Sequence, residues 1–341
     1  MNLPSISTRR TTLALLTAAL LTGSGMAAAA DNPFLGNWAL TIPGGGAGWL
    51  GVTESQGKLA GGILWGGGSV MPLASVTVDG DKLVVTRLHV GQQKNPSGKT
   101  VKTTTTETIT ATLDGDKMQL VTVKRRADGV EFDRATFTGK RTPPLSSPPD
   151  LSKVKFGQPI SLFNGKDLTG WRLTDPHATN GWSVKDGVLN NDPAQQPGKP
   201  HKHYGNLRTD GEFEDFHLTL ETNVPPGSNS GIYLRGIYEV QVLDSFGKPL
   251  DSHNMGAIYS RITPCVAAEK PAGQWQTFDI TLVDRHVTVI LNGKKIIDNQ
   301  PLLGCTGGAL WSDQFRPGPI YLQGDHTGAN YRNVLLRPVV K

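Results

Sequence analysis

The segment HVTVILNGKKII, residues 286–297, decides the fold class of the second half of the chain. Val287, Val289 and Leu291 alternate with other side chains, and this two-residue period is typical of a strand that buries one face. Asn292-Gly293 then supplies the two-residue turn that antiparallel hairpins prefer, and a second apolar strand follows it. The segment therefore predicts an antiparallel hairpin within a half-buried sheet.

The same pattern extends outward from this hairpin. Phe216, Leu218 and Leu220 alternate with polar residues in the same way. Residues 154–338 accommodate about ten strands of ordinary length, and no amphipathic helix interrupts them. We therefore predict an all-β domain in which two antiparallel sheets pack as a jelly-roll sandwich.

Residues 31–141 form a second, smaller β region. Asp79-Gly80, Asp114-Gly115 and Asp128-Gly129 are turn signals between short strands, so we expect an antiparallel meander that makes a small barrel or a sandwich. Its opening, Gly36-Asn37-Trp38, resembles the Gly-x-Trp start of lipocalin-like barrels. The prolines of residues 142–153 lack the N–H donor that a sheet needs, which predicts a linker with few contacts between the two halves.

Residues 1–30 have the features of a secretory signal peptide. Arg9 and Arg10 precede an apolar run, and the small residues Ala27 to Ala30 end the segment. We expect a periplasmic or secreted protein without a membrane anchor, exported by the Sec or the Tat route. The formal charge of +5 comes from scattered basic residues, which argues against a nucleic-acid partner.

The sequence contains two cysteines, Cys265 and Cys305, and both stand beside glycine or proline in loop segments. In an oxidising compartment two such residues can pair, so we expect a disulfide between them. The alternative is two free, buried thiols, because the sequence does not give the distance between their Cα atoms.

The segment SGIYLRGIYEVQVLDS, residues 230–245, is the predicted site. If Ile232 and Leu234 face the core, strand alternation turns four polar side chains to the other face. These are Tyr233, Arg235, Glu239 and Gln241. An aromatic ring stacks on a sugar and the polar groups bind its hydroxyls, whereas the alternative is an ordinary solvated face.

Asp244 follows this face with the spacing Glu239-x-Gln241-x-x-Asp244. In a regular strand Asp244 would point to the core, so either a β-bulge redirects it or the strand ends before it. Laminarinase-type glycosidases on the jelly roll place acidic residues at this interval. Gln241 replaces the middle acid here, which disfavours a conventional pair of catalytic carboxylates.

The segment LFNGKDLTGW, residues 162–171, resembles the opening signature of the 3-keto-disaccharide hydrolase family. Further segments agree with the same family in order, and they are residues 182–189, 229–245, 256–259, 270–276, 318–323 and 331–334. The resemblance covers nearly all of residues 154–338 and none of the first β region. It implies a concanavalin-like jelly roll that acts on glycosides already oxidised at C3 of a sugar ring.

A ketone at C3 makes the C2 proton acidic, so a base can remove it and the C1 oxygen can leave by β-elimination. Addition of water then completes a net hydrolysis. Such a site needs a base near C2, a donor to the enediolate oxygen and an acid for the leaving oxygen. The candidates for these catalytic roles are Glu239, Asp244, His253 and His326. The candidates for substrate binding are Tyr233, Arg235, Gln241, Tyr259 and Gln323.

The resemblance also implies that a separate sugar 3-dehydrogenase supplies the substrate. A divalent cation such as Ca²⁺ is compatible with the oxygen-rich candidates, although the sequence has no dedicated metal-binding loop. Two other functions stay open at this point. One is a conventional jelly-roll glycoside hydrolase that uses Glu239 and Asp244, and the other is a non-catalytic carbohydrate-binding module.

Overall fold

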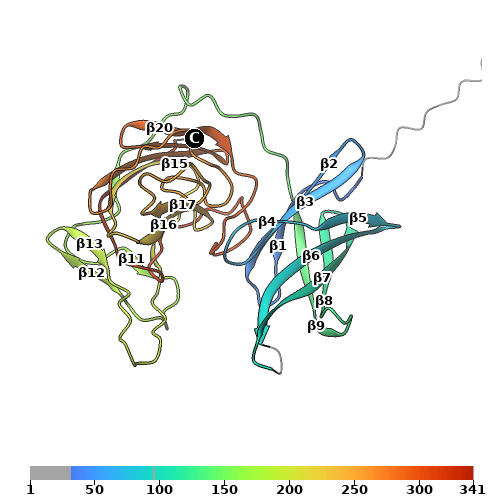
Figure 1. Cartoon of the computed structure of the whole chain (residues 1–341). Helices are drawn as coiled ribbons and strands as arrows, with labels where there is room; N and C mark the ends of the chain where they lie inside the picture. The colour runs from blue at the N-terminus through green and yellow to red at the C-terminus, as the bar shows by residue number, and fades with distance from the viewer. Residues whose placement is uncertain (1–31, 95–96, 341) are drawn as a thin grey trace, which may run out of the picture. The chain divides into compact units, whose positions relative to one another are not determined.

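The first β region is one antiparallel sheet (Figure 1). In the computed structural model, which describes residues 32–94 and 97–340, its strands follow the order β4-β3-β2-β1-β9-β8-β7-β6-β5. They are β1 (Gly36–Thr41), β2 (Ala47–Ser55), β3 (Lys58–Trp65), β4 (Met71–Pro72), β5 (Ser75–Asp79), β6 (Lys82–Lys94), β7 (Thr100–Asp114), β8 (Lys117–Arg125) and β9 (Glu131–Thr142). The predicted signal peptide lies outside the described residues.

This sheet curls around its own apolar core. Buried side chains from β1 to β3 and from β5 to β9 belong to a single cluster, so the sheet bends back on itself as a small barrel, one of the two forms that the sequence left open. Trp38 is fully buried in that core, and its indole N–H donates to the carbonyl of Phe34 at 3.0 Å. The guanidinium of Arg141 lies 4.2 Å from the centre of the Trp38 ring.

The second region contains two further antiparallel sheets. One follows the order β12-β13-β22-β15-β18-β19-β20, with β10 paired to β22, and the other follows β11-β14-β21-β16-β17. They are β10 (Ile160–Ser161), β11 (Trp171–Leu173), β12 (Trp182–Lys185), β13 (Val188–Asn191), β14 (Leu207–Thr209), β15 (Phe216–Asn223), β16 (Asn229–Leu234), β17 (Tyr238–Leu243), β18 (Gln276–Val283), β19 (His286–Leu291), β20 (Lys294–Pro301), β21 (Tyr321–Leu322) and β22 (Ala329–Pro338).

The two sheets pack face to face as the predicted jelly-roll sandwich. Leu218 of β15 and Val289 of β19 share one apolar core with Ile232 and Val240 of the other sheet. The predicted hairpin joins β19 to β20, and both turn residues, Asn292-Gly293, have positive φ angles of 51° and 78°. The all-β prediction is confirmed, and among the described residues no helix is long and apolar enough to cross a membrane.

The two β regions are in extensive contact, contrary to the expectation from the proline-rich linker. From Phe34 onward the described chain forms one compact unit. Trp49 of β2 donates its indole N–H to the carbonyl of Leu303 at 3.0 Å, and the guanidinium of Arg261 lies 4.5 Å from its ring. Ala47 and Leu64 join Trp49 in the apolar cluster of the sandwich. The first region is therefore packed onto the second and does not hang from a free linker.

Cys265 and Cys305 are free thiols, so the predicted disulfide is wrong. Cys305 is buried, and its Sγ lies 3.8 Å from the carbonyl of Gly48 in β2. Cys265 is exposed, and its Sγ lies 3.7 Å from the carbonyl of Lys295 in β20. The two cysteines thus lie in different surroundings, one exposed beside β20 and one buried against β2.

Thiol titration is expected to find two free thiols that react at different rates. Burial raises the pKa of the Cys305 thiol to about 11, so little reactive thiolate forms there, whereas Cys265 is open to the reagent. Native protein treated with Ellman's reagent should release one equivalent quickly and the second only on unfolding. If the unfolded, unreduced protein contained no free thiol, the disulfide predicted from the sequence would be right after all.

Candidate functional site

The hairpin of β16 and β17 places three predicted site residues on one face. Its register pairs Tyr233 with Glu239 and Gly231 with Gln241. The alternate positions, Ile232 and Val240, face the sandwich core, so the polar side chains point the other way. That face is covered, because Glu239 is only 3% exposed. The alternative of a solvated outer face is thereby excluded.

These side chains line a cavity of about 250 Å³. The predicted residues that share it are Tyr233, Glu239, Gln241, Tyr259, Gln323 and His326. Backbone hydrogen bonds bring Tyr259 to the hairpin, because its N–H donates to the carbonyl of Glu239 at 3.0 Å. The lining residues that the sequence did not predict are Gly67, Gly68, Asn206, Asn229, Gly307, Gly308, Tyr321 and Asp325.

Glu239 is a buried carboxyl with an unusually weak acidity. Burial raises its pKa to about 8, although the hydrogen bond from Tyr233 and the charge of His326 act in the opposite direction. The space for the carboxyl depends on Gly231. A Cβ at that position would overlap Oε1 of Glu239 and lie 3.0 Å from its Cγ. The chain thus has a glycine where any side chain would displace this acid.

Tyr233 is positioned to serve both protonation states of Glu239. Its hydroxyl lies 2.8 Å from Oε2 of Glu239 and 2.7 Å from the carbonyl of Gly307. When Glu239 is ionised, the hydroxyl can donate to the carboxylate. When Glu239 is protonated, it can donate to the Tyr233 oxygen while the hydroxyl donates to Gly307. Glu239 can therefore gain or lose a proton and keep a hydrogen bond to Tyr233 in either state.

His326 also lines the cavity, and its acidic partner Asp325 lies beside it. Its Nδ1 lies 2.6 Å from Oδ1 of Asp325. This hydrogen bond raises the pKa of His326, and the charges of Asp325 and Glu239 act in the same direction while burial opposes them. Asp325 thus stabilises the protonated form of the His326 imidazole.

Two amide oxygens of the lining are buried without a hydrogen-bond partner within the described part of the chain. They are Oδ1 of Asn229 and Oε1 of Gln323. Buried acceptors in proteins are nearly always paired, so these two are suited to accept from the hydroxyls of a bound molecule. The rings of Tyr233 and Tyr321 stack at 3.9 Å and give the cavity a rigid aromatic wall.

Arg235 does not belong to the face that strand alternation predicted. β16 ends at Leu234, and Arg235 has a left-handed φ of 55°, so the two-residue period stops before it. Its guanidinium donates to the carbonyls of Gln314 and Arg316, at 2.8 Å each. Arg235 holds a loop in place and does not line the cavity, contrary to its prediction as a substrate-binding residue.

Asp244 and His253 also lie outside the cavity lining. β17 ends at Leu243, so Asp244 falls in the next turn and its Oδ2 accepts from the N–H of Gly227 at 2.9 Å. The ring of His253 packs edge-on against Tyr259, with 4.8 Å between their centres. His253 thus contacts the lining residue Tyr259 and does not line the cavity itself.

Within residues 32–94 and 97–340, no group of three or more His, Cys, Asp or Glu side chains is arranged to hold a metal ion. The two acidic residues of the lining are held by other partners. Glu239 is bonded to Tyr233, and Asp325 is bonded to His326. The residues present therefore give no ready-made ligand set for the divalent cation considered from the sequence.

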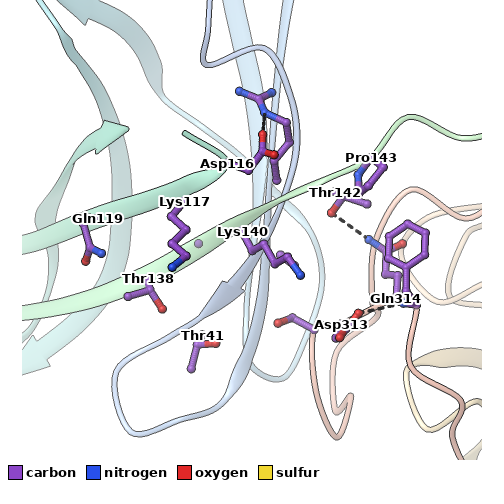
Figure 2. A pocket seen from close by; sticks show the side chains of 15 residues that line it. Thr41, Asp116, Lys117, Gln119, Thr138, Lys140, Thr142, Pro143, Asp313 and Gln314 are labelled. Carbon is purple, nitrogen blue, oxygen red and sulfur yellow. Dashed lines mark hydrogen bonds and ion pairs between the residues drawn. The ribbon is translucent and has the colours of Figure 1, made fainter. Parts of the chain in front are cut away.

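A larger cavity of about 730 Å³ lies next to β1, β8 and β9 (Figure 2). Figure 2 shows Lys117, Lys140 and Thr138 facing the loop that carries Gln314, whose side chain donates to Thr142 at 3.3 Å. This cavity contains none of the predicted site residues. We take the smaller cavity as the candidate site, because it gathers six of the predicted site residues, including Glu239 and His326 with their raised pKa values, together with the unpaired amides.

The fold and the cavity together define a jelly-roll protein with a small, polar, tyrosine-walled pocket of the kind that binds a sugar. The chain belongs to the 3-keto-alpha-glucoside-1,2-lyase-like domain family, whose model matches residues 158–337. The family resemblance found in the sequence is thus confirmed. The first β region lies outside the matched residues.

A 3-keto-disaccharide hydrolase from Bacteroides thetaiotaomicron is 25% identical over 166 residues, which cover 41% of this chain and 57% of the relative. The chain thus spans little more than half the length of that relative. A solved structure from Parabacteroides distasonis, provisionally described as a glycosyl hydrolase, is 30% identical with a TM-score of 0.44 and covers 58% of this chain and 93% of that one. LamA from Zobellia galactanivorans, solved with laminaritriose and laminaritetraose, is 12% identical with a TM-score of 0.32 and covers 56% and 94%.

Proposed function

We propose that the chain is an exported enzyme that cleaves 3-keto-glycosides, including 3-keto-disaccharides, between C1 and the glycosidic oxygen. The family match and the name of the B. thetaiotaomicron relative support this substrate class. Residues 1–30 support export to the periplasm or beyond. A separate sugar 3-dehydrogenase would supply the ketone, because the reaction needs a substrate already oxidised at C3.

The environment of Glu239 carries the proposal. A carboxyl with a pKa of about 8 is a stronger base than an ordinary carboxylate, which suits removal of a carbon-bound proton. A conventional glycosidase needs a second carboxyl across the sugar from the first. Gln241 occupies the intermediate position, and Asp244 lies outside the cavity lining. The other carboxyl of the lining, Asp325, is hydrogen-bonded to His326, so the arrangement favours proton abstraction over a carboxylate pair.

In the proposed reaction, ionised Glu239 takes the proton from C2, and the C–H electron pair forms an enolate with the C3 ketone. The enolate then forms the C1–C2 double bond and expels the glycosidic oxygen, which takes a proton from cationic His326. Neutral His326 accepts a proton from the water that adds to C1, and Glu239, after its proton has exchanged with solvent, protonates C2. The products are the free 3-keto sugar and the alcohol.

The other lining residues bind and orient the sugar in this proposal. Asn229, Gln241 and Gln323 accept from or donate to ring hydroxyls, and Tyr259 closes one side of the pocket. Tyr233 follows Glu239 through both protonation states, as its two hydrogen-bond distances allow. These contacts hold C2 near Glu239, which is the geometric requirement for general base catalysis.

Cleavage in deuterated water tests the mechanism. Full-length protein given a 3-keto-glucoside should yield a 3-keto sugar that carries deuterium at C2, after correction for exchange in an enzyme-free control. Direct displacement at C1 would leave C2 unlabelled. The matching unoxidised glucoside is the second control, because its turnover without preference for the ketone would indicate a conventional glycosidase. Binding of both sugars without cleavage would indicate a carbohydrate-binding module.

A further inference from the structure

The loop between β3 and β4 belongs to the first β region, yet it borders the candidate site. We call residues 66–70 the glycine loop. Gly67 and Gly68 belong to the lining of the cavity that contains Glu239. The family model begins only at residue 158, so this loop comes from a part of the chain that the family match does not include.

The glycine loop contacts the sandwich backbone to backbone. The N–H of Gly308 donates to the carbonyl of Gly66 at 3.4 Å. A Cβ on Gly307 would overlap the carbonyl of Gly68 and lie 2.6 Å from its nitrogen, so only glycine permits this approach. The carbonyl of Gly307 is also the one that lies 2.7 Å from the Tyr233 hydroxyl. The loop thus packs against Gly307, whose carbonyl shares the Tyr233 hydroxyl with Glu239.

Side-chain contacts hold the glycine loop at Ser69 and at Val70. The Oγ of Ser69 lies 2.8 Å from Nε2 of His253, whose Nδ1 lies 2.6 Å from Oδ1 of Asp251. The N–H of Val70 donates to Oγ of Ser260 at 2.9 Å. His253 in turn packs on the cavity residue Tyr259. One chain of contacts therefore joins the loop to a side chain that would touch the sugar.

We propose that the glycine loop is a specificity-determining wall of the active site, contributed by the first β region. The inference rests on the proposed function and adds that the first region limits which 3-keto-glycosides enter. Gly67 is the position that sets the limit, because a Cβ there would meet no atom within 4 Å. Since Gly67 also lines the cavity, the absence of a side chain leaves open space at the cavity edge, and a larger residue would take up that space.

Gly67→Leu in the full-length protein tests the wall, with Gly91→Leu as the matched control. Gly91 lies in β6 of the same barrel, where a Cβ would make an ordinary 3.5 Å contact with Thr103. Gly67→Leu should raise KM for 3-keto-glucosides by about tenfold or more, with a stronger effect for a glucosyl than for a methyl leaving group. Its melting temperature should match that of the control. Equal KM values in the two leucine variants would overturn the proposal that the glycine loop limits substrate entry.

A second variant and a binding measurement separate the wall from the chemistry. Ser69→Ala adds no volume but removes the bond to His253, so KM should rise while kcat changes less, and Ser69→Thr should restore KM. Calorimetric titration with 3-keto-glucose and with methyl glucoside measures the affinity of the pocket for each sugar without turnover. If wild type binds but does not cleave, weaker binding by Gly67→Leu supports the wall while the proposed reaction fails. If wild type binds neither sugar, both are overturned.

Discussion

Replacement of Glu239 by glutamine is expected to lower kcat/KM for a 3-keto-glucoside by about 10² to 10⁴, the usual contribution of a general base. The amide keeps the shape of the side chain in the space beside Gly231 but cannot accept the C2 proton. Deuterium exchange at C2 and cleavage should therefore disappear together, as followed by steady-state kinetics and by NMR of the recovered sugar.

Glu54→Gln is the matched control, because Glu54 is an exposed residue of β2 and should change neither exchange nor cleavage. Loss of cleavage with exchange intact would assign Glu239 to protonation of the leaving oxygen instead. Unchanged kinetics in Glu239→Gln would remove this residue from the reaction. The effects of His326 variants should be compared by the step that each one blocks, because groups that act together are not additive.

The pH dependence of the same residue has a defined sign. The reaction needs ionised Glu239 and protonated His326, so kcat/KM of the wild type should pass through a maximum. It should rise as Glu239, with its pKa of about 8, ionises and fall as His326 loses its proton. The contribution of Glu239 to stability should instead only decrease as the pH rises. Below pH 4.5 Glu239 is protonated in both states, and between pH 4.5 and about 8 only the unfolded chain ionises, which favours unfolding. Glu239→Gln should therefore gain melting temperature relative to the wild type as the pH rises through this window.

Strand periodicity was enough to predict the centre of the site. Tyr233, Glu239 and Gln241 lie on regular parts of β16 and β17, so the two-residue rule placed them correctly. The same rule includes Asn229, which precedes Gly231 by two residues and lines the cavity. Asn229 carries no charge, so its sequence position did not mark it as a site residue. The rule failed at Arg235 because the period does not indicate where a strand gives way to a left-handed turn.

The contribution of the first β region could not be predicted from the sequence. Gly66 to Gly68 look like an ordinary flexible turn, and nothing in their pattern indicates the loop against which they pack. Cys305 is likewise buried against Gly48 of β2, a contact that its own loop sequence does not indicate. Contacts between segments far apart in the chain decide both features, and local patterns do not report such contacts.

Trp49→Ala is expected to destabilise the full-length protein by about 3–5 kcal/mol, the usual cost of removing a buried aromatic side chain. Trp49 is 8% exposed and packs with the core of the sandwich, although it belongs to β2 of the barrel. The change would remove the hydrogen bond to Leu303 and the ring beneath the buried guanidinium of Arg261, whose pKa burial lowers to about 10. Chemical denaturation measures the loss.

The same variant should also impair the site, because Trp49 pairs with Leu64 in the strand that leads into the glycine loop. At a temperature where Trp49→Ala is still folded, KM for 3-keto-glucosides should rise. Phe132→Ala is the control, since Phe132 is 47% exposed on the barrel and its removal should cost less than about 1 kcal/mol. Equal stability losses in the two variants, or a destabilised Trp49→Ala protein with unchanged KM, would mean that the barrel does not support the site through this contact.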